Sequence, residues 1–364
     1  MATSMSTITL DARAPAAGAA TALKAQDDKA MLRAAAELTR DLVQPRAPIY
    51  WADMLGSAVL GYAALVGAVT LSGAWAIAAG VVAVLALYRA MSFIHEVSHM
   101  KHTGAMRGFR RGWDAVVGVP MLIPSFMYEG VHNLHHAKTR YGTVEDPEYL
   151  PLALMKPWTL PVFILVSALA PLGLLIRYGV LAPLSAIVPG MRRPVVERFS
   201  ALAINPQFRR RAPEGEAKRY WDRVEIAASL WALALIAMVA TGVVPLRAFA
   251  IGFAIASGVA VLNQVRTLVA HLWENDGEPM SMTAQYLDSV NVPPPALLPG
   301  LWAPVGLRYH ALHHLLPGLP YHSLGEAHRR LSAALEPGSS YHKASYTGLP
   351  YLVGKIARST MGLR

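Results

Sequence analysis

Three short stretches of the chain carry histidines at helical spacing. They read "HEVSHMKH" from His95 to His102, "HNLHH" from His132 to His136, and "HALHH" from His310 to His314. Residues three or four positions apart share one face of a helix. The first and third histidines of each H-x-x-H-H motif therefore lie over one patch, and so do His95 and His99. Such clustered imidazoles indicate a metal site.

The candidate ligands are nine of the 13 histidines. They are His95, His99, His132, His135, His136, His271, His310, His313 and His314. A tetrahedral zinc takes only four ligands, whereas two metals with four or five nitrogens each use all nine. A set without carboxylates favours redox chemistry over hydrolysis, and imidazole binds iron, copper, zinc and nickel alike. His102 lies on the same face as His95 and stays open as a further ligand, whereas His322, His328 and His342 are interpreted as surface or supporting residues.

The first five residues of the first motif, H-E-x-x-H, also match the zinc peptidases. A membrane peptidase of that kind needs a distant Asp ligand, and "SVNVPPPALLPG" offers none. It would also leave both H-x-x-H-H motifs without a role. We therefore interpret Glu96 as a residue that orients a ligand imidazole through its other ring nitrogen.

The composition predicts a membrane protein. Hydrophobic residues make up 54% of the 364 residues and charged residues 15%, whereas soluble domains are about 25% charged. The net charge of +10 fits basic loops, and no nucleic-acid-binding module is present, so no nucleic acid is expected as a partner. The absence of cysteine excludes disulfides, iron–sulfur clusters and thiol catalysis within this sequence.

Four stretches have the length and apolar character of a transmembrane helix, about 20 residues. They cover roughly residues 51–71, 74–93, 226–243 and 249–270. The apolar region 158–189 is interrupted by Arg177 and prolines, which leaves its number of crossings open, although an even number is expected. The basic loops place both termini and the histidines in the cytoplasm. Residues 1–49 are predicted to form a cytoplasmic extension, with an amphipathic helix at 27–43 that lies on the membrane or on the catalytic domain of residues 50–364.

Together, the motifs resemble the membrane fatty acid desaturase superfamily over roughly residues 50–345. Its three histidine boxes correspond to "HEVSH", "HNLHH" and "HALHH", and its isolated ligand to His271 in "RTLVAHLW". The stretch "LWAPVGLRYHALHHLLPGLPYHSLGEAHRRL" is similar to bacterial acyl desaturases in particular. The resemblance implies an all-α integral membrane protein of the bacterial inner membrane. It also implies four long transmembrane helices and a cytoplasmic helical cap that holds two iron ions on the nine histidines.

The resemblance further implies an oxygen-dependent desaturase that introduces a double bond into a fatty acyl chain. The acyl chain would be carried on CoA, on acyl-carrier protein or in a membrane lipid. Because neither "HPGG" nor cysteine occurs, electrons are expected from a separate ferredoxin, rubredoxin or cytochrome b5. Two alternatives stay open: a hydroxylase or ketolase of a lipid, carotenoid or alkane on the same scaffold, and a non-enzymatic membrane metal carrier or sensor.

Several polar residues near the motifs have two interpretations. Asp146, Asp288 and Asn291 could brace imidazoles or simply form turns, which Asp and Asn favour. Arg266, near a membrane edge, could contact a substrate head group or reach for the interface. A basic cluster could bind a phosphate or only fix the topology, and it consists of Arg107, Arg110 and Arg111.

Overall fold

The computed structural model describes residues 26–361, and within them the fold is helical with only isolated β-bridges. The predicted all-α class is therefore confirmed. The long helices are α3 (Ala47–Thr70), α4 (Gly73–His99), α11 (Gly215–Ala240) and α12 (Leu246–Leu268). The shorter helices are α2 (Lys29–Leu38), α5 (Phe109–Trp113), α6 (His132–His135), α7 (Thr159–Leu165), α8 (Ala170–Ile176), α9 (Ala182–Ile187), α10 (Arg192–Phe199), α13 (Met282–Asp288), α14 (Pro299–Trp302), α15 (His310–Leu315), α16 (Leu324–Ala334) and α17 (Leu349–Met361).

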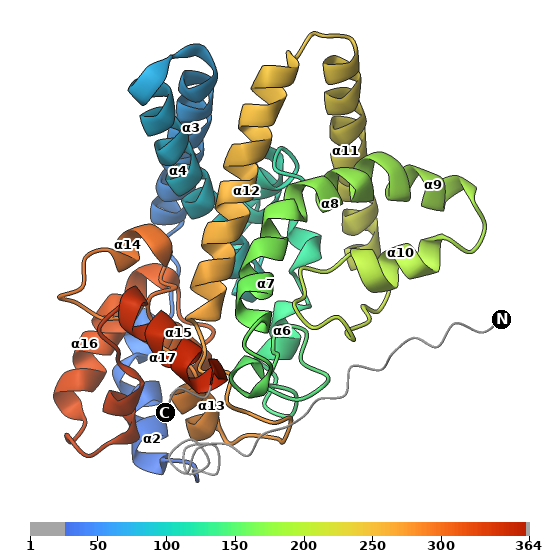
Figure 1. Cartoon of the computed structure of the whole chain (residues 1–364). Helices are drawn as coiled ribbons and strands as arrows, with labels where there is room; N and C mark the ends of the chain where they lie inside the picture. The colour runs from blue at the N-terminus through green and yellow to red at the C-terminus, as the bar shows by residue number, and fades with distance from the viewer. Residues whose placement is uncertain (1–25, 362–364) are drawn as a thin grey trace.

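The long helices form two hairpins, α3 with α4 and α11 with α12. Figure 1 shows them side by side, with α6 and α15 near the lower ends of α4 and α12. Large apolar side chains such as Val59, Trp75 and Leu230 are exposed on the hairpins, as expected for helices that face lipid. Helix α4 continues past the predicted end of its span, at residue 93, to His99. The span itself therefore carries the first histidine motif into the site.

The expected count of four long apolar helices is too low. Residues Thr159–Ile187 form a fifth helix that is long and apolar enough to cross a membrane. It comprises α7, α8 and α9, joined by a 3-10 turn (Val166–Leu169) and a π-helical turn (Arg177–Leu181). Figure 1 shows α7 beside α12, while α8 and α9 turn away toward α11. The prolines bend this segment without ending it, which is why the sequence pattern appeared interrupted.

Arg177 is accommodated in this apolar segment by a charged partner. It is buried and forms an ion pair with Glu225 of α11, and it also donates to the hydroxyl of Ser200 and the carbonyl of Phe199. Buried arginine needs such pairing because an isolated charge in an apolar medium is costly. The residue that interrupted the hydropathy pattern thus ties the bent segment to α11.

The amphipathic helix predicted near the N-terminus is α2, which packs on the domain itself. Met31 and Ala35 are buried against Ala327 and Leu331 of α16. Asp28 caps the helix by accepting from the backbone N–H of Met31 at 3.0 Å. Of the two predicted positions, the structure has the one against the rest of the chain, on α16. The cytoplasmic side and the boundary at residue 49 stay predictions, and residues 1–25 lie outside the described part.

Gly61 lies at a close approach between α3 and α4. A Cβ atom at this position would lie 2.7 Å from Leu87 side-chain atoms and 3.0 Å from the Leu87 backbone nitrogen. Small residues allow two membrane helices to approach in this way. Gly56, on the same helix, has open space around its Cβ position.

We predict that Gly61→Val lowers the thermal unfolding temperature of the purified protein in detergent. Overpacking of a close contact costs about 1–3 kcal/mol, and here backbone atoms prevent relaxation. Gly56→Val is the matched control and should change the temperature little, since valine is a better helix former than glycine. Equal unfolding temperatures for both variants would contradict the close packing of α3 on α4.

Candidate metal centre

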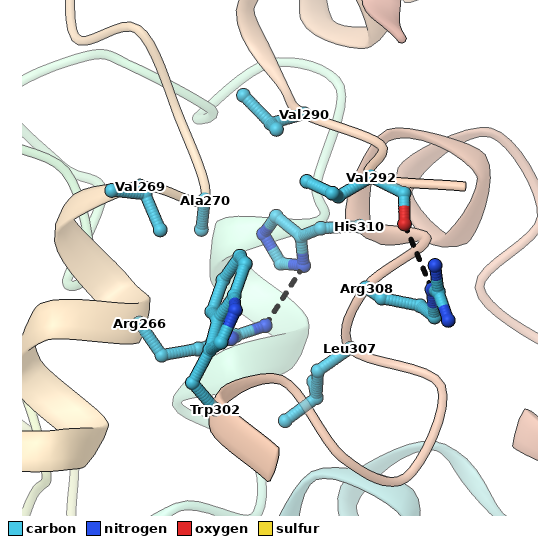
Figure 2. A pocket seen from close by; sticks show the side chains of 9 residues that line it. All are labelled: Arg266, Val269, Ala270, Val290, Val292, Trp302, Leu307, Arg308 and His310. Atoms are coloured by element: carbon cyan, nitrogen blue, oxygen red, sulfur yellow. Dashed lines mark hydrogen bonds between the residues drawn. The ribbon is translucent and has the colours of Figure 1, made fainter. Parts of the chain in front are cut away.

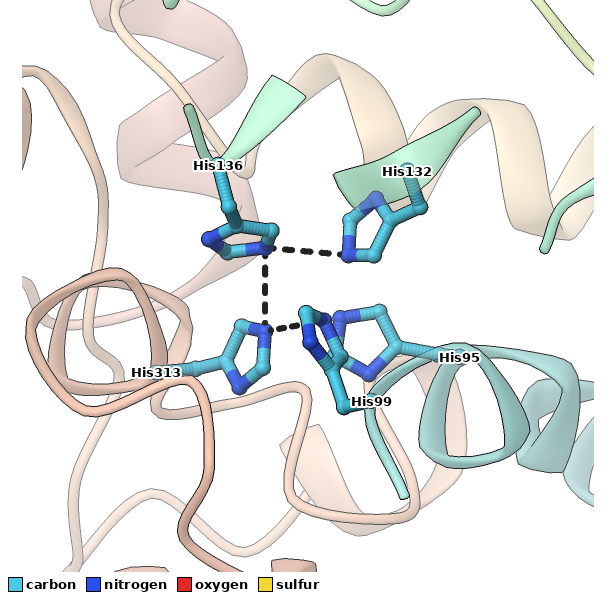
Figure 3. Close-up of side chains that lie close together, drawn as sticks. All are labelled: His95, His99, His132, His136 and His313. Carbon is cyan, nitrogen blue, oxygen red and sulfur yellow. Dashed lines mark hydrogen bonds between the residues drawn. The ribbon is translucent and has the colours of Figure 1, made fainter. Parts of the chain in front are cut away.

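The nine predicted histidines converge in two groups. The first, called the five-histidine group, contains His95, His99, His132, His136 and His313. The second, called the four-histidine group, contains His135, His271, His310 and His314. Within each group, one ring nitrogen per residue lies within 4.8 Å of all the others. Figure 3 shows the rings of the five-histidine group pointing toward one another from separate segments.

The H-x-x-H-H motifs contribute to the two groups in a reciprocal way. His132 and His136, four residues apart, belong to the five-histidine group, while His135 between them belongs to the other group. In "HALHH", the first and third histidines belong to the four-histidine group and His313 to the five-histidine group. Each motif therefore bridges both groups, and the rings of His136 and His314 lie only 4.3 Å apart across the boundary.

His271 is the one ligand candidate among the nine that a β-bridge, and not a helix, positions. Helix α12 ends at Leu268, and His271 pairs with Ser289 in an isolated β-bridge. The backbone N–H of Val290 donates to the carbonyl of Ala270 at 3.0 Å. This short antiparallel contact aims the His271 ring at His310, and their Nε2 atoms lie 3.0 Å apart.

The inward ring nitrogens suit a bound cation. His313 Nε2 lies 3.0 Å from His99 Nε2 and 3.1 Å from His136 Nε2. His95 is buried, and neither of its ring nitrogens has a hydrogen-bond partner among the described residues. Lone pairs that face each other at this distance repel unless protons or cations lie between them. Nine converging nitrogens therefore fit two ions that accept imidazole ligands, such as iron.

Among the histidines that lie outside the membrane-spanning helices, burial keeps most rings uncharged. It lowers the pKa of His310, His313 and His314 well below the usual value for histidine, and the neighbouring imidazoles lower it further. Burial also lowers the pKa of His135, but the adjacent Asp146 carboxylate outweighs this effect and leaves that pKa raised. Neutral imidazole is the form that binds a metal.

A second layer of residues holds the outer ring nitrogens. Asp146, which is fully buried, lies 2.9 Å from Nδ1 of His135 and also accepts from the backbone N–H groups of Gly142 and Glu148. Glu148 lies 2.8 Å from Nδ1 of His132, and burial raises the pKa of Glu148 to about 7. Carboxylates in this position fix the orientation and tautomer of a ligand imidazole.

Asp288 is connected to the His271 ring through the hydroxyl of Tyr141. The hydroxyl of Tyr141 donates to Asp288 Oδ2 at 2.7 Å and lies 2.8 Å from Nδ1 of His271. Burial raises the pKa of Asp288 to about 6. The sequence did not single out Tyr141 or Glu148. Glu148 lies in the same "VEDPEY" stretch as Asp146, which could have indicated it, but no local pattern links Tyr141 to His271.

Glu96 and Asn291 do not contact the rings in this way. Glu96 lies 3.8 Å from His95 Nδ1, accepts from the backbone N–H of Tyr321 at 3.1 Å, and bonds the hydroxyl of Tyr50. Asn291 accepts from the backbone N–H of Leu312 at 3.0 Å, so it holds the backbone of α15. Both residues therefore fix the segments that carry histidines.

The remaining histidines lie outside both groups. His102 lies 2.8 Å from Glu129, and Arg110 donates to the same carboxylate oxygen at 2.7 Å. Arg110 also lies over the ring of Tyr220. This member of the predicted basic cluster therefore already has two partners within the protein. His322, His328 and His342 contact Arg46, Tyr341 and Leu335, respectively.

A curated relative is similar to the chain over nearly its whole length. It is a ceramide hydroxylase of Caulobacter vibrioides (strain NA1000 / CB15N), 50% identical over 336 residues, which cover 92% of this chain and 95% of that protein. No solved structure matches the chain. This similarity contradicts the predicted desaturase activity, because the relative is named as a hydroxylase. It favours the alternative of a hydroxylase on the same scaffold.

A match to a protein-family model confirms the family resemblance found in the sequence. The model of the fatty acid desaturase family matches residues 72–345, a stretch that contains all nine histidines of the two groups. Both the family match and the half-identical relative cover most of the chain. The chain therefore belongs to the fatty acid desaturase family.

Proposed function

We propose that the protein is a membrane hydroxylase of ceramide-class lipids. The observation that carries the proposal is the 50% identity to a ceramide hydroxylase over 92% of the chain. The two histidine groups support oxidative chemistry, because they offer nitrogen ligands only. The exposed apolar helices support a substrate that is itself part of the membrane.

The proposed cofactors are two iron ions, one held by each histidine group, with molecular oxygen as co-substrate. Bound iron would supply the activation of oxygen, which protein side chains cannot perform. In the overall reaction a C–H bond of the lipid becomes C–OH. One oxygen atom enters the lipid, and the other leaves as water after taking up two electrons and two protons. We place the electron source in a separate carrier protein.

The proposed role of the chain is to hold, orient and dry the site. Asp146, Glu148 and Tyr141 keep the outer nitrogens of three ligand rings in fixed orientations. Trp273, which is fully buried, packs edge-on against His271 and donates to the carbonyl of Leu268. Excluding bulk water in this way limits side reactions of an oxidising centre. We further propose that the site and both termini face the cytoplasm, as the basic loops predict, which requires that the bent segment Thr159–Ile187 adds no fifth crossing.

The two ligand groups can be tested by iron content. His313→Ala removes a ring that lies close to both His99 and His136, so we expect iron to fall toward half that of the wild type. His102→Ala is the control, because this ring pairs with Glu129 outside both groups. Iron would be measured by elemental analysis of the purified proteins. Wild-type iron in His313→Ala, or an equal loss in His102→Ala, would contradict the assignment.

The orienting role of Asp146 predicts a graded effect. Asp146→Asn should weaken iron binding about 10–100-fold, because the amide cannot replace the carboxylate charge beside His135. The measurement is iron retention against a chelator series. Asp222→Asn on the surface of α11 serves as the control, since the partners of Asp222 within residues 26–361 are the exposed side chains of Lys218 and Arg192. Unchanged retention in Asp146→Asn would argue against this role.

The reaction type is tested by lipid mass spectrometry. We expect cells that express the wild-type protein with a suitable electron donor to contain ceramides that have gained one oxygen. His313→Ala should abolish this product. Ceramides or acyl chains lighter by two hydrogens, without added oxygen, would overturn the proposed hydroxylation.

A further inference from the structure

The C-terminal end of helix α12 lies at the level of the candidate metal centre. Arg266, in the last turn of α12, lies 3.1 Å from Nδ1 of His310, and Figure 2 shows the two side chains meeting in the lining of a small pocket. Helix α11 runs antiparallel to α12 and is joined to it by the turn of residues 241–245. The start of α11 and the end of α12 therefore lie on the same side of this hairpin, which is the side of the histidines.

The bent segment Thr159–Ile187 begins at that same level. The ring of Phe163 lies 6.2 Å from the ring of Trp273, which follows the end of α12. The segment then runs along α12 until the carbonyl of Ala168 accepts from the hydroxyl of Ser257 at 2.8 Å. Ser257 lies midway along α12. Because α12 has the length of a membrane span, the segment has reached only about half its depth at this point.

The chain then passes to α11 and returns toward the histidine side. A Cβ atom on Gly179 would lie 3.9 Å from the Cβ atom of Ala232, in the apolar part of α11. Further along, Val196 of α10 is buried in the same cluster as Trp221, which lies near the start of α11. Figure 1 shows α8 and α9 at the middle height of the long helices and α10 below them. The segment thus begins and ends on one side of the molecule.

The corner between α9 and α10 exposes apolar side chains. Ile187, the last residue of α9, is 76% exposed, and Leu184, Val188 and Phe199 are exposed as well. Exposed apolar side chains continue along the rest of the segment, at Leu165, Leu169 and Leu172. A contiguous apolar surface of this kind indicates contact with lipid. The corner is therefore the edge of a surface that already faces the membrane.

Two arginines without a carboxylate partner lie beside this corner. The backbone N–H of Arg210 donates to the carbonyl of Glu197 at 2.9 Å, which places the residues next to them, Arg198 and Arg211, close together. Both side chains are exposed, and no carboxylate in residues 26–361 forms an ion pair with either of them. Glu197 itself pairs with Arg193. The end of α10 therefore presents a net positive charge next to an apolar edge.

We infer that the segment Thr159–Ile187 enters and leaves the membrane on the side of the metal centre, and that the corner between α9 and α10 binds anionic phospholipids there. Ile187 and Val188 lie among the acyl chains, while Arg198 and Arg211 contact the phosphates. An apolar edge with adjoining basic residues is typical of segments that lie in the membrane interface. An acidic protein partner would match the arginines but would give the apolar edge no lipid. The chain then crosses the membrane four times, whatever reaction it catalyses.

The cysteine-free sequence makes the course of the segment testable with single cysteines. Lys156→Cys and Glu214→Cys place one exposed thiol before and one after the segment. A membrane-impermeant maleimide should label both from the same side of sealed, oriented vesicles, the side that also labels Glu336→Cys beyond α16. Val243→Cys, in the turn between α11 and α12, should be labelled from the other side. Labelling of Lys156→Cys and Glu214→Cys from opposite sides would overturn the inference.

The depth of the corner is tested by a nitroxide attached to Ile187→Cys in phospholipid vesicles. Collisions with oxygen, which concentrates in lipid, should exceed collisions with a water-soluble nickel chelate, as for a nitroxide at Leu230→Cys on the apolar face of α11. A nitroxide at Glu336→Cys is the control and should show the reverse. A nickel-dominated signal at Ile187→Cys would contradict insertion of the corner.

The lipid preference is tested with spin-labelled phosphatidylglycerol and phosphatidylcholine in vesicles that contain the protein. The wild type should immobilise more of the anionic lipid. The double variant Arg198→Gln/Arg211→Gln should reduce this preference, by up to about fivefold per arginine. Arg33→Gln/Arg40→Gln, which removes two exposed arginines at α2, is the control. An unchanged preference in Arg198→Gln/Arg211→Gln would overturn the lipid contact. If that variant instead slowed reduction by an acidic electron carrier, the patch would be a protein-docking site.

Discussion

The packing of nine imidazole rings with their nitrogens facing one another is the constraint on which the rest of the structure depends. Such rings repel when charged and gain little when neutral, so they converge only if the surrounding fold holds them there. The reciprocal use of the H-x-x-H-H motifs is one device, because each motif joins both groups. The extension of α4 beyond the apolar hairpin to His99 is another. The candidate metal centre is thus built at the ends of the long helices.

The outer hydrogen bonds complete this arrangement. Asp146, Glu148 and Tyr141 each hold a different ring from behind, and all three come from the loop after α6. Asp288 reaches His271 through Tyr141, which connects that loop to α13. One loop therefore sets ring orientation in both groups.

The histidines were predictable because helical spacing is a local property. The pairs four residues apart lie together as expected. However, the middle histidine of each H-x-x-H-H motif, His135 or His313, belongs to the other group, and this depends on how distant helices pack. The bent segment Thr159–Ile187 was undercounted because Arg177 and the prolines disrupted a pattern that tertiary contacts with α11 restore. Tyr141 could not be found, since 130 positions separate it from His271.

The expected desaturase activity was wrong for a different reason. The same nine histidines can serve either removal of hydrogen or insertion of oxygen, so their spacing carries no information on the outcome. The choice between the two reactions therefore depends on features of the chain outside the histidine motifs. The similarity to a ceramide hydroxylase over nearly the full length supplied that information.

The most direct test of the account is the reaction of the purified, iron-loaded protein with ceramide, a suitable electron donor and oxygen-18-labelled dioxygen. The account predicts a ceramide that carries one labelled hydroxyl. A product without the label, or one that has lost two hydrogens and gained no oxygen, would contradict oxygen insertion at the nine-histidine site.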